Sequence, residues 1–251
     1  MLRLKTSDEI KLMRNAGRVV AEVLAMVEEM IRPGLTTLEI DQAAEELIRS
    51  FGAIPSFKGY GSPPFPGSVC VSIDAEVVHG IPSSSRIIQE GMIVSVDVGA
   101  LLEGYHGDAA RTFAVGNVDP AVSKLMEITQ ECFWKAFELA QPGARLGDLS
   151  AAIQKHAESH GYGVVRELTG HGIGRNLHED PDLPNYGKAG HGIRLEPGIV
   201  IAMEPMINLG SRRIAMNPDG WTIVTADGKP SSHYENTFAV TADGPVILTQ
   251  R

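Results

Sequence analysis

The sequence predicts an α+β fold made of two similar halves, each with two helices followed by strands. The chain has 251 residues, of which 43% are hydrophobic and 21% charged, and this composition suits one globular domain. The helix-ending signals Pro33-Gly34 and Gly52 recur, at the same separation, as Pro142-Gly143 and Gly161. We therefore expect a single domain over 1–251, whose halves 8–115 and 121–251 arose by duplication.

The first half opens with two helices. Apolar residues recur at helical spacing over 8–31, and Ser7 is placed to cap the start of this helix. Thr36 and Glu39 have the spacing of a capping box, in which each side chain bonds the backbone N–H of the other residue. A second helix is therefore expected from this box to Ser50.

The second half repeats this order. Apolar periodicity predicts helices over 121–139 and 146–159. The apolar stretches 93–97 and 200–204 also correspond, because each follows a glycine closely and ends in a carboxylate, at Asp97 and at Glu204. Several matches at nearly equal separations favour duplication over a chance recurrence of Pro-Gly.

A predicted β-hairpin brings two aspartates together. Alternation over 93–99 places valines on one face and Asp97 on the other. The chain turns around 102–104 and returns through Asp108, so the two aspartates are either directly opposed or diagonal neighbours, depending on which residues form the turn. Carboxylates at this distance repel each other unless a cation lies between them, so the hairpin predicts a metal site.

Three further candidate ligands come from the second half. Glu204 and Glu235 stand in apolar strand contexts, and His171 opens the glycine-containing segment 171–179. Four carboxylates and one imidazole form an oxygen-rich set that suits Mn, Fe, Co or Zn and contains too many carboxylates for a structural zinc site. Two divalent cations would balance four negative charges that are costly to bury alone.

Charge and composition argue against several other classes of protein. The formal net charge is −9 and the 22 Lys and Arg residues are scattered, so we expect no nucleic-acid partner. No apolar run has the length of a membrane helix, and the charged N-terminal segment is unlike a secretory signal. Cys70 and Cys132 stand far apart in apolar sequence, which predicts buried thiols and a reducing, cytoplasmic location.

Five short motifs follow one another along the chain. They are His79-Gly80-Ile81-Pro82, the Asp97 and Asp108 pair, His171-Gly172-Ile173-Gly174 with His178, Met203-Glu204-Pro205, and Tyr234-Glu235-Asn236. Together they cover nearly the whole chain and resemble the type I methionine aminopeptidases. The resemblance implies a pseudo-two-fold pita-bread fold. It also implies that the chain removes the initiator methionine from nascent proteins and prefers a small second residue.

The resemblance assigns a role to each matching position. Five positions match metal ligands: Asp97, Asp108, His171, Glu204 and Glu235. Asp108 and Glu235 would bridge two ions that activate water and polarise the scissile carbonyl. Glu204 also matches the residue that accepts the proton of that water, and His178 the residue that stabilises the developing oxyanion. His79 matches the residue that contacts the substrate backbone and assists proton movement to the leaving amine.

The resemblance implies that the substrate side chain enters an apolar pocket, and the positions that match its lining are Gly59, Ser62, Phe65, Cys70, Leu177 and Trp221. Relatives carry larger residues where this chain has Gly59, Ser62 and Leu177, so the pocket is expected to differ in width or shape. The flexible thioether of methionine suits an irregular apolar slot.

Other polar residues receive no role from the sequence. These are the histidines without motif context, His106, His156, His160, His191 and His233, and the acidic residues Glu179, Asp180 and Asp182, which are expected as solvated loop charges. The expected partners are nascent polypeptide N-termini, the chain is expected to be a monomer, and the resemblance leaves room for transient association with the ribosome.

Two alternatives are weighed against this interpretation. One is an aminopeptidase of the same fold that cleaves before proline, but such relatives generally carry an additional N-terminal domain. The other is a binding module that has lost its metals. Loss of a ligand would indicate the second alternative, whereas all five matching positions hold residues that can bind a metal.

Overall fold

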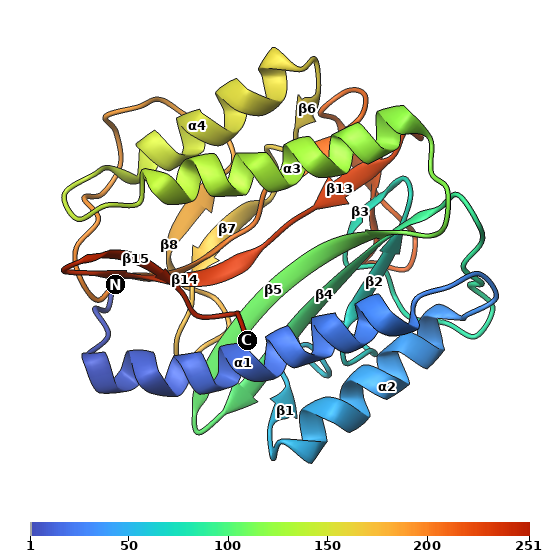
Figure 1. The fold of residues 1–251 in the computed structure, drawn as a ribbon, viewed down its shortest axis with the longest axis horizontal. Helices are drawn as coiled ribbons and strands as arrows, with labels where there is room; N and C mark the ends of the chain where they lie inside the picture. The colour runs from blue at the N-terminus through green and yellow to red at the C-terminus, as the bar shows by residue number, and fades with distance from the viewer. Residues whose placement is uncertain (1) are drawn as a thin grey trace.

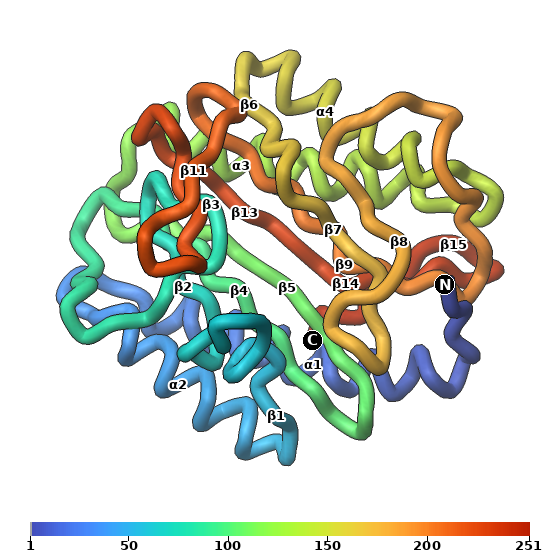
Figure 2. The backbone as a smooth tube through the Cα atoms, turned by 180° about the vertical axis from the view of Figure 1, so that it is seen from behind, coloured from blue at the N-terminus to red at the C-terminus, as the bar shows by residue number. Residues whose placement is uncertain are grey.

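Four helices lie on one side of the strands in the computed structural model, which describes residues 2–251 (Figure 1). They are α1 (Ser7–Met30), α2 (Thr37–Ser50), α3 (Pro120–Glu138) and α4 (Leu146–Ser159). Seen from behind, the strands and their connecting loops lie in front of the helices (Figure 2). Within the described residues, no helix combines the length and apolarity needed to span a membrane.

The strands form four antiparallel sheets over residues 2–251. A four-stranded sheet runs β1 (Ile54–Pro55), β4 (Ile93–Leu102), β2 (Cys70–Ile73), with β5 (Tyr105–Ala114) also paired to β4. A five-stranded sheet runs β15 (Gly244–Ile247), β14 (Asn236–Thr241), β9 (Val200–Met203), β7 (Thr169–Gly172), β8 (Glu179–Pro184). Two three-stranded sheets run β13 (Ser231–His233), β10 (Met206–Asn208), β6 (Gly163–Val164), and β11 (Ile214–Met216), β12 (Ile223–Thr225), β3 (Glu76–Val78).

The predicted helices are found with small shifts at their ends. The start of α1 corrects the expected cap: Thr6, not Ser7, accepts from the backbone N–H of Glu9, and the Glu9 carboxylate accepts in return from the Thr6 N–H. The reason is spacing, since a capping box needs its acid three residues after the cap. The predicted box at Thr36 and Glu39 is present, and α3 begins one residue earlier than expected, at Pro120.

Each helix pair covers its own apolar core. Val94, Val96 and Val98 of β4 are fully buried in a cluster with residues of α1 and α2. A second cluster joins α3 and α4 to strands of the five-stranded sheet, with Phe133 and Phe238 among its largest members. Each such buried side chain contributes about 1.5–3 kcal/mol through removal of apolar surface from water. The apolar faces of the strands are therefore directed toward the helices.

The β4–β5 register decides between the two turns left open by the sequence. Glu103 and Gly104 both have positive φ values, of 52° and 79°, as the two central residues of a tight hairpin turn require. Asp108 therefore pairs with Gly99, and Asp97 pairs with Ala110. The two aspartates are diagonal neighbours on the face turned away from the helices.

The second pair of carboxylates has a similar placement. In the β9–β14 ladder Met203 pairs with Asn236. Continuing this register by one residue places Glu204, directly after β9, beside Glu235, directly before β14. Both acidic pairs thus come from adjacent antiparallel strands.

Candidate metal centre and substrate cavity

One cavity of about 130 Å³ is lined by the predicted metal ligands, by the two predicted histidines and by four of the six predicted pocket positions. These residues are Phe65, Cys70, His79, Asp97, Asp108, His171, Leu177, His178, Glu204, Trp221 and Glu235. Phe57 and Tyr60 line the same cavity and were not predicted. Strands and loops from both halves of the chain therefore meet at a single site.

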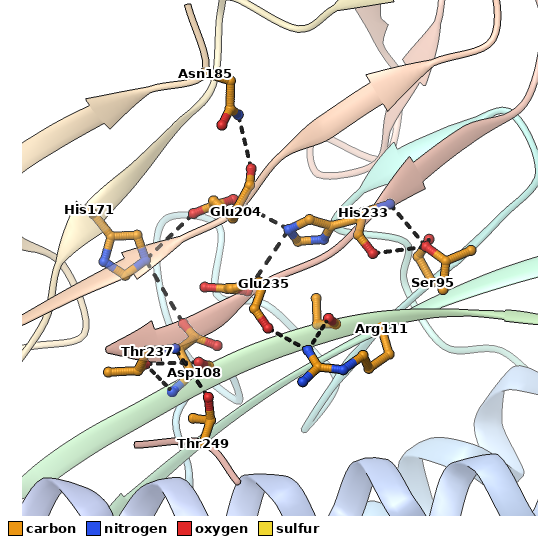
Figure 3. A network of polar contacts seen from close by, with 12 residues as sticks. Ser95, Asp108, Arg111, His171, Asn185, Glu204, His233, Glu235, Thr237 and Thr249 are labelled. Carbon is orange, nitrogen blue, oxygen red and sulfur yellow. Dashed lines mark hydrogen bonds and ion pairs between the residues drawn. The ribbon is translucent and has the colours of Figure 1, made fainter. Parts of the chain in front are cut away.

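The predicted metal ligands lie close enough together to share a cation. His171 Nε2 is 3.9 Å from Asp108 Oδ2 and 3.8 Å from Glu204 Oε1 (Figure 3). Asp108, His171 and Glu235 each offer one ligand atom, and these atoms all lie within 4.8 Å of one another. Asp97 is adjacent to this group through the diagonal relation on β4 and β5.

The tautomer of His171 suits coordination. Its Nδ1 lies 2.9 Å from the carbonyl oxygen of Gly172. A carbonyl oxygen only accepts, so Nδ1 carries the proton and Nε2 presents its lone pair to the carboxylates. Metal-ligating histidines commonly use this arrangement, in which a backbone carbonyl fixes the tautomer.

Backbone contacts hold the acidic residues in place. The Asp108 N–H donates to Thr237 Oγ1 at 3.0 Å, and that hydroxyl donates to the Asp108 carbonyl at 2.8 Å. Arg111 Nη1 donates to the Glu235 carbonyl at 2.5 Å, and Asn185 Nδ2 to the Glu204 carbonyl at 2.9 Å (Figure 3). These bonds fix the main chain and leave the carboxylate oxygens available to a ligand.

The four carboxyl groups have strongly raised pKa values. Burial raises the pKa of Asp97 to about 7 and that of Glu204 to about 8. Burial and the charges of neighbouring carboxylates raise the pKa values of Asp108 and Glu235 well above the usual range. Cations would relieve both effects, because they favour the deprotonated form of each group.

Three carboxylate oxygens of the site lack hydrogen-bond partners in the described part of the chain, and this shows whether the site suits a metal. Asp97 Oδ1, Asp108 Oδ1 and Glu235 Oε1 are buried and have no hydrogen-bond partner within residues 2–251. A buried polar atom without a partner costs about 1–3 kcal/mol, so three such oxygens around one centre need an explanation. A divalent cation supplies it, and the hard donor set suits Mn, Fe, Co or Zn.

The two remaining predicted histidines border the same cavity. Burial lowers the pKa of His79 to about 4, and its backbone has a positive φ of 59°, which is uncommon outside glycine and clusters at functional sites. The His178 ring lies 4.2 Å from that of His171. The Tyr60 hydroxyl is 2.5 Å from His178 Nδ1. Burial also lowers the pKa of His178.

An apolar wall completes the cavity. Phe65 meets Trp221 edge to face, with ring centroids 5.2 Å apart, and Cys70 and Leu177 are buried beside them. Burial raises the pKa of the Cys70 thiol well above its usual value, so this residue is an apolar wall and not a nucleophile. Gly59 and Ser62 correct the expectation, because within the described residues neither belongs to the lining, whereas their neighbour Tyr60 does.

His233 received no role from the sequence, yet it contacts two of the carboxylates. Its Nε2 is 3.6 Å from Glu204 Oε2 and 3.9 Å from Glu235 Oε2. One signal could have found it: His233 precedes Glu235 by two residues, and residues at this spacing in an extended chain share a face. For Tyr60 and Phe57 the sequence offers no such signal, because they come from a loop segment.

Glu179 corrects another expectation. It lies on β8, and its carboxylate pairs with Lys5 at 2.8 Å, with the Glu179 side chain 12% exposed. Glu179 is therefore not a solvated loop charge. It forms a partly buried ion pair with Lys5 that ties the N-terminal segment to the second half.

A family model, curated relatives and solved structures were compared with this chain, and their matches agree with one another. A model of metallopeptidase family M24 matches residues 11–242. The methionine aminopeptidase of Clostridium acetobutylicum is 51% identical over 249 residues, covering 99% of both chains. The solved structure of the Thermotoga maritima methionine aminopeptidase is 44% identical, with a TM-score of 0.98 and 100% of both chains covered. A prolidase structure from Pyrococcus horikoshii is 26% identical with a TM-score of 0.78, over 98% of this chain and 63% of that one.

These similarities confirm the α+β pita-bread fold expected from the sequence. The chain matches the methionine aminopeptidases over almost its whole length and at far higher identity than the prolidase. The chain therefore belongs to metallopeptidase family M24 and, within it, to the type I methionine aminopeptidases.

Proposed function

We propose that this protein removes the N-terminal methionine from nascent polypeptides by hydrolysing the first peptide bond, with a preference for a small second residue. The observation that carries the proposal is the position of buried, hydrogen-bond-deficient carboxylates in the lining of an apolar cavity. The family supports the same conclusion, since relatives at about half identity over their full length are methionine aminopeptidases.

Two divalent metal ions are the proposed cofactors, drawn from Co, Mn, Fe or Zn. Five residues would hold them: Asp97, Asp108, His171, Glu204 and Glu235. Two ions would balance the charge of the four carboxylates, and Asp108 and Glu235 would hold them together with the other three residues. When bound, such ions polarise the scissile carbonyl and lower the pKa of water.

His178 is the proposed donor to the carbonyl oxygen as it gains negative charge. The Tyr60 phenol can donate its proton to His178 Nδ1, at 2.5 Å. This hydrogen bond places the imidazole proton on Nε2, because a neutral ring carries only one N–H. Nε2–H is then free to donate to the substrate, as a preorganised oxyanion donor requires.

Glu204 and His79 are assigned the proton transfers. The Glu204 carboxylate would accept the proton of the attacking water as general base. His79, whose lowered pKa keeps its ring neutral, would bond the substrate backbone and relay to the leaving amine the proton that Glu204 takes from water. The positive φ of His79 directs its backbone away from the usual strand path and is consistent with a functional position.

The methionine side chain is proposed to occupy the apolar part of the cavity, against Phe65, Cys70, Leu177 and Trp221. Thioether sulfur makes favourable contacts at ring edges, and two aromatic rings are available here. Phe57 and Tyr60 extend this wall. Their presence supports an occupant that is apolar, unbranched and flexible.

The proposal also covers domain organisation, cellular location and oligomeric state. Residues 1–251 would form one catalytic domain with duplicated halves 8–115 and 121–251. The free, buried Cys70 and Cys132 support a cytoplasmic location. A monomer is also part of the proposal. Because the proposed substrates are nascent chains, the proposal includes transient contact with the ribosome.

Peptide hydrolysis tests the function directly. The purified protein is stripped with a chelator and then assayed with Met-Ala-Ser, Leu-Ala-Ser and Met-Pro-Ser, with and without added Mn, Co, Fe or Zn. We expect release of the N-terminal residue only from the methionyl peptides, and not from Leu-Ala-Ser, and only after metal is restored. Full activity after verified removal of metal would exclude the metallopeptidase assignment.

The same assay separates the two alternatives. An enzyme that cleaves before proline would prefer Met-Pro-Ser by a wide margin over Met-Ala-Ser. A binding module would hydrolyse neither peptide with any metal, yet would retain the peptides in equilibrium binding. The complete ligand set at the five positions argues against the second outcome.

A further inference from the structure

His233 stands out among residues that the proposed mechanism does not use. It is 2% exposed and ends β13, where it pairs with Met206 of β10. Its main chain is held by Thr112, whose Oγ1 accepts from the His233 N–H at 2.9 Å and donates to the His233 carbonyl at 2.9 Å. Ser95 Oγ lies 2.8 Å from the same threonine oxygen. The base of this side chain is therefore rigidly placed.

The ring of His233 is directed at the acidic cluster. Its Nε2 is 3.6 Å from Glu204 Oε2 and 3.9 Å from Glu235 Oε2 (Figure 3). This nitrogen is buried and has no hydrogen-bond partner at normal distance among residues 2–251. The Glu204 carboxylate thus lies between two imidazoles, because His171 Nε2 is 3.8 Å from its other oxygen, Oε1.

His233 approaches Glu204 from outside the substrate cavity. Within the part of the chain that the structure describes, it is absent from the lining of the 130 Å³ cavity. It lines a separate cavity of about 520 Å³, together with residues of α1 and α3 and with Arg111 and Tyr234. Because His233 does not line the substrate cavity, we expect any effect on catalysis to be exerted through the carboxylates.

We propose that His233 is a positioning residue whose Nε2–H donates to Glu204 Oε2 and fixes the orientation of this carboxylate. This inference rests on the proposed function, in which Glu204 accepts a proton and also holds metal. The two oxygens of Glu204 then have distinct surroundings, Oε1 on the side of His171 and Oε2 on the side of His233. Groups that orient metal ligands typically change activity or metal affinity by about 10- to 100-fold when removed.

Three variants separate the hydrogen bond from packing. His233→Gln keeps an amide N–H close to the position of Nε2, His233→Asn is too short to reach Glu204, and His233→Met fills the space without a donor. Steady-state hydrolysis of Met-Ala-Ser is expected to show kcat about 10- to 100-fold lower for the Asn and Met variants, with KM little changed. The Gln variant is expected to recover most of the activity.

Cobalt binding supplies a readout that does not depend on turnover. Each metal-free variant is titrated with Co²⁺ by calorimetry and by visible absorption. Weaker cobalt binding in the Asn and Met variants, with the wild-type affinity and spectrum restored in the Gln variant, supports the positioning role. If wild type itself binds cobalt but cleaves no methionyl peptide, the proposed function fails while this comparison still tests His233.

Other outcomes overturn the inference. Asn and Met variants with wild-type kcat and cobalt affinity would show that the hydrogen bond is not needed. A Gln variant as impaired as the Asn variant, or unfolding of both the Asn and Met variants in thermal melts, would assign His233 to packing. A changed cobalt spectrum in the fully active Gln variant would identify His233 as a metal ligand itself.

Discussion

The hydroxyl group of Tyr60 lies 2.5 Å from Nδ1 of His178, across 118 residues of sequence. The two rings are also in contact, with centroids 5.2 Å apart. Tyr60 comes from a loop of the first half and His178 from the segment that follows β7, so the contact joins the two halves at the mouth of the site. It determines which nitrogen of His178 carries the proton.

Tyr60→Phe removes the donor while keeping the ring. We expect kcat for Met-Ala-Ser to fall about 10-fold, because His178 would no longer be held in the Nε2–H tautomer, while KM changes little. Tyr162→Phe, in the segment after α4, serves as the matched control. Equal kcat values for the two variants would show that the Tyr60 hydroxyl has no part in orienting His178.

Glu204→Gln tests the proposed general base. The substitution keeps size and removes a proton acceptor, so we expect kcat to fall by at least about 100-fold. The metal-free variant should melt no lower than metal-free wild type, because the amide removes one of several repelling buried carboxylates. Circular dichroism and thermal melts establish folding, and a folded variant with near-normal turnover would contradict the assigned role.

The stability of the metal-free protein should depend on pH through the acidic cluster. The pKa values of Asp97 and Glu204 are raised to about 7 and about 8, from ordinary values of 3.8 and 4.5. A carboxyl group with a raised folded pKa contributes its full stabilisation below the ordinary pKa and loses it as pH rises through the folded value. His79 and His171, with pKa values lowered to about 4, oppose this trend only below their ordinary value of 6.5.

Between pH 6.5 and about 8.5 we therefore expect the Tm of chelator-treated protein to fall, by about 2–4 °C for each kcal/mol lost. Added Mn or Co should remove the slope, because bound cations favour the deprotonated carboxylates. Glu204→Gln should give a shallower slope than wild type. A metal-free Tm that stays constant or rises across this window would contradict the raised pKa values.

Leu177 offers a test of the substrate cavity. Leu177→Ala shortens a side chain of the apolar wall beside His178 and so widens the cavity. The methionine side chain should then fit less well. We expect kcat/KM for Met-Ala-Ser to fall about 10-fold or more and the ratio for Phe-Ala-Ser over Met-Ala-Ser to rise. Leu183→Ala, equally buried but in the core under α3 and α4, is the control for lost stability. A specificity ratio unchanged in Leu177→Ala would place the methionine side chain elsewhere.

Local signals in the sequence were sufficient for the helices and for the proposal that Asp97 and Asp108 share a cation. The capping box at Thr36 and the alternation around Asp97 depend on neighbours within a few residues, and the structure agrees with both. The same locality explains the error at Ser7. A hydroxyl directly before an apolar run predicts a cap at Ser7, but the partner acid Glu9 stands three residues after Thr6 and selects it.

The sequence by itself determined the α+β class, the hairpin that carries Asp97 and Asp108 on adjacent strands, and the ligand types that predict a divalent metal. Periodicity and short spacings record these features because each depends on chain geometry over a few residues. The tertiary structure alone decided that His233 meets Glu204 from behind and that Tyr60 bonds His178. These contacts depend on how distant strands and loops pack, and no local pattern specifies that packing.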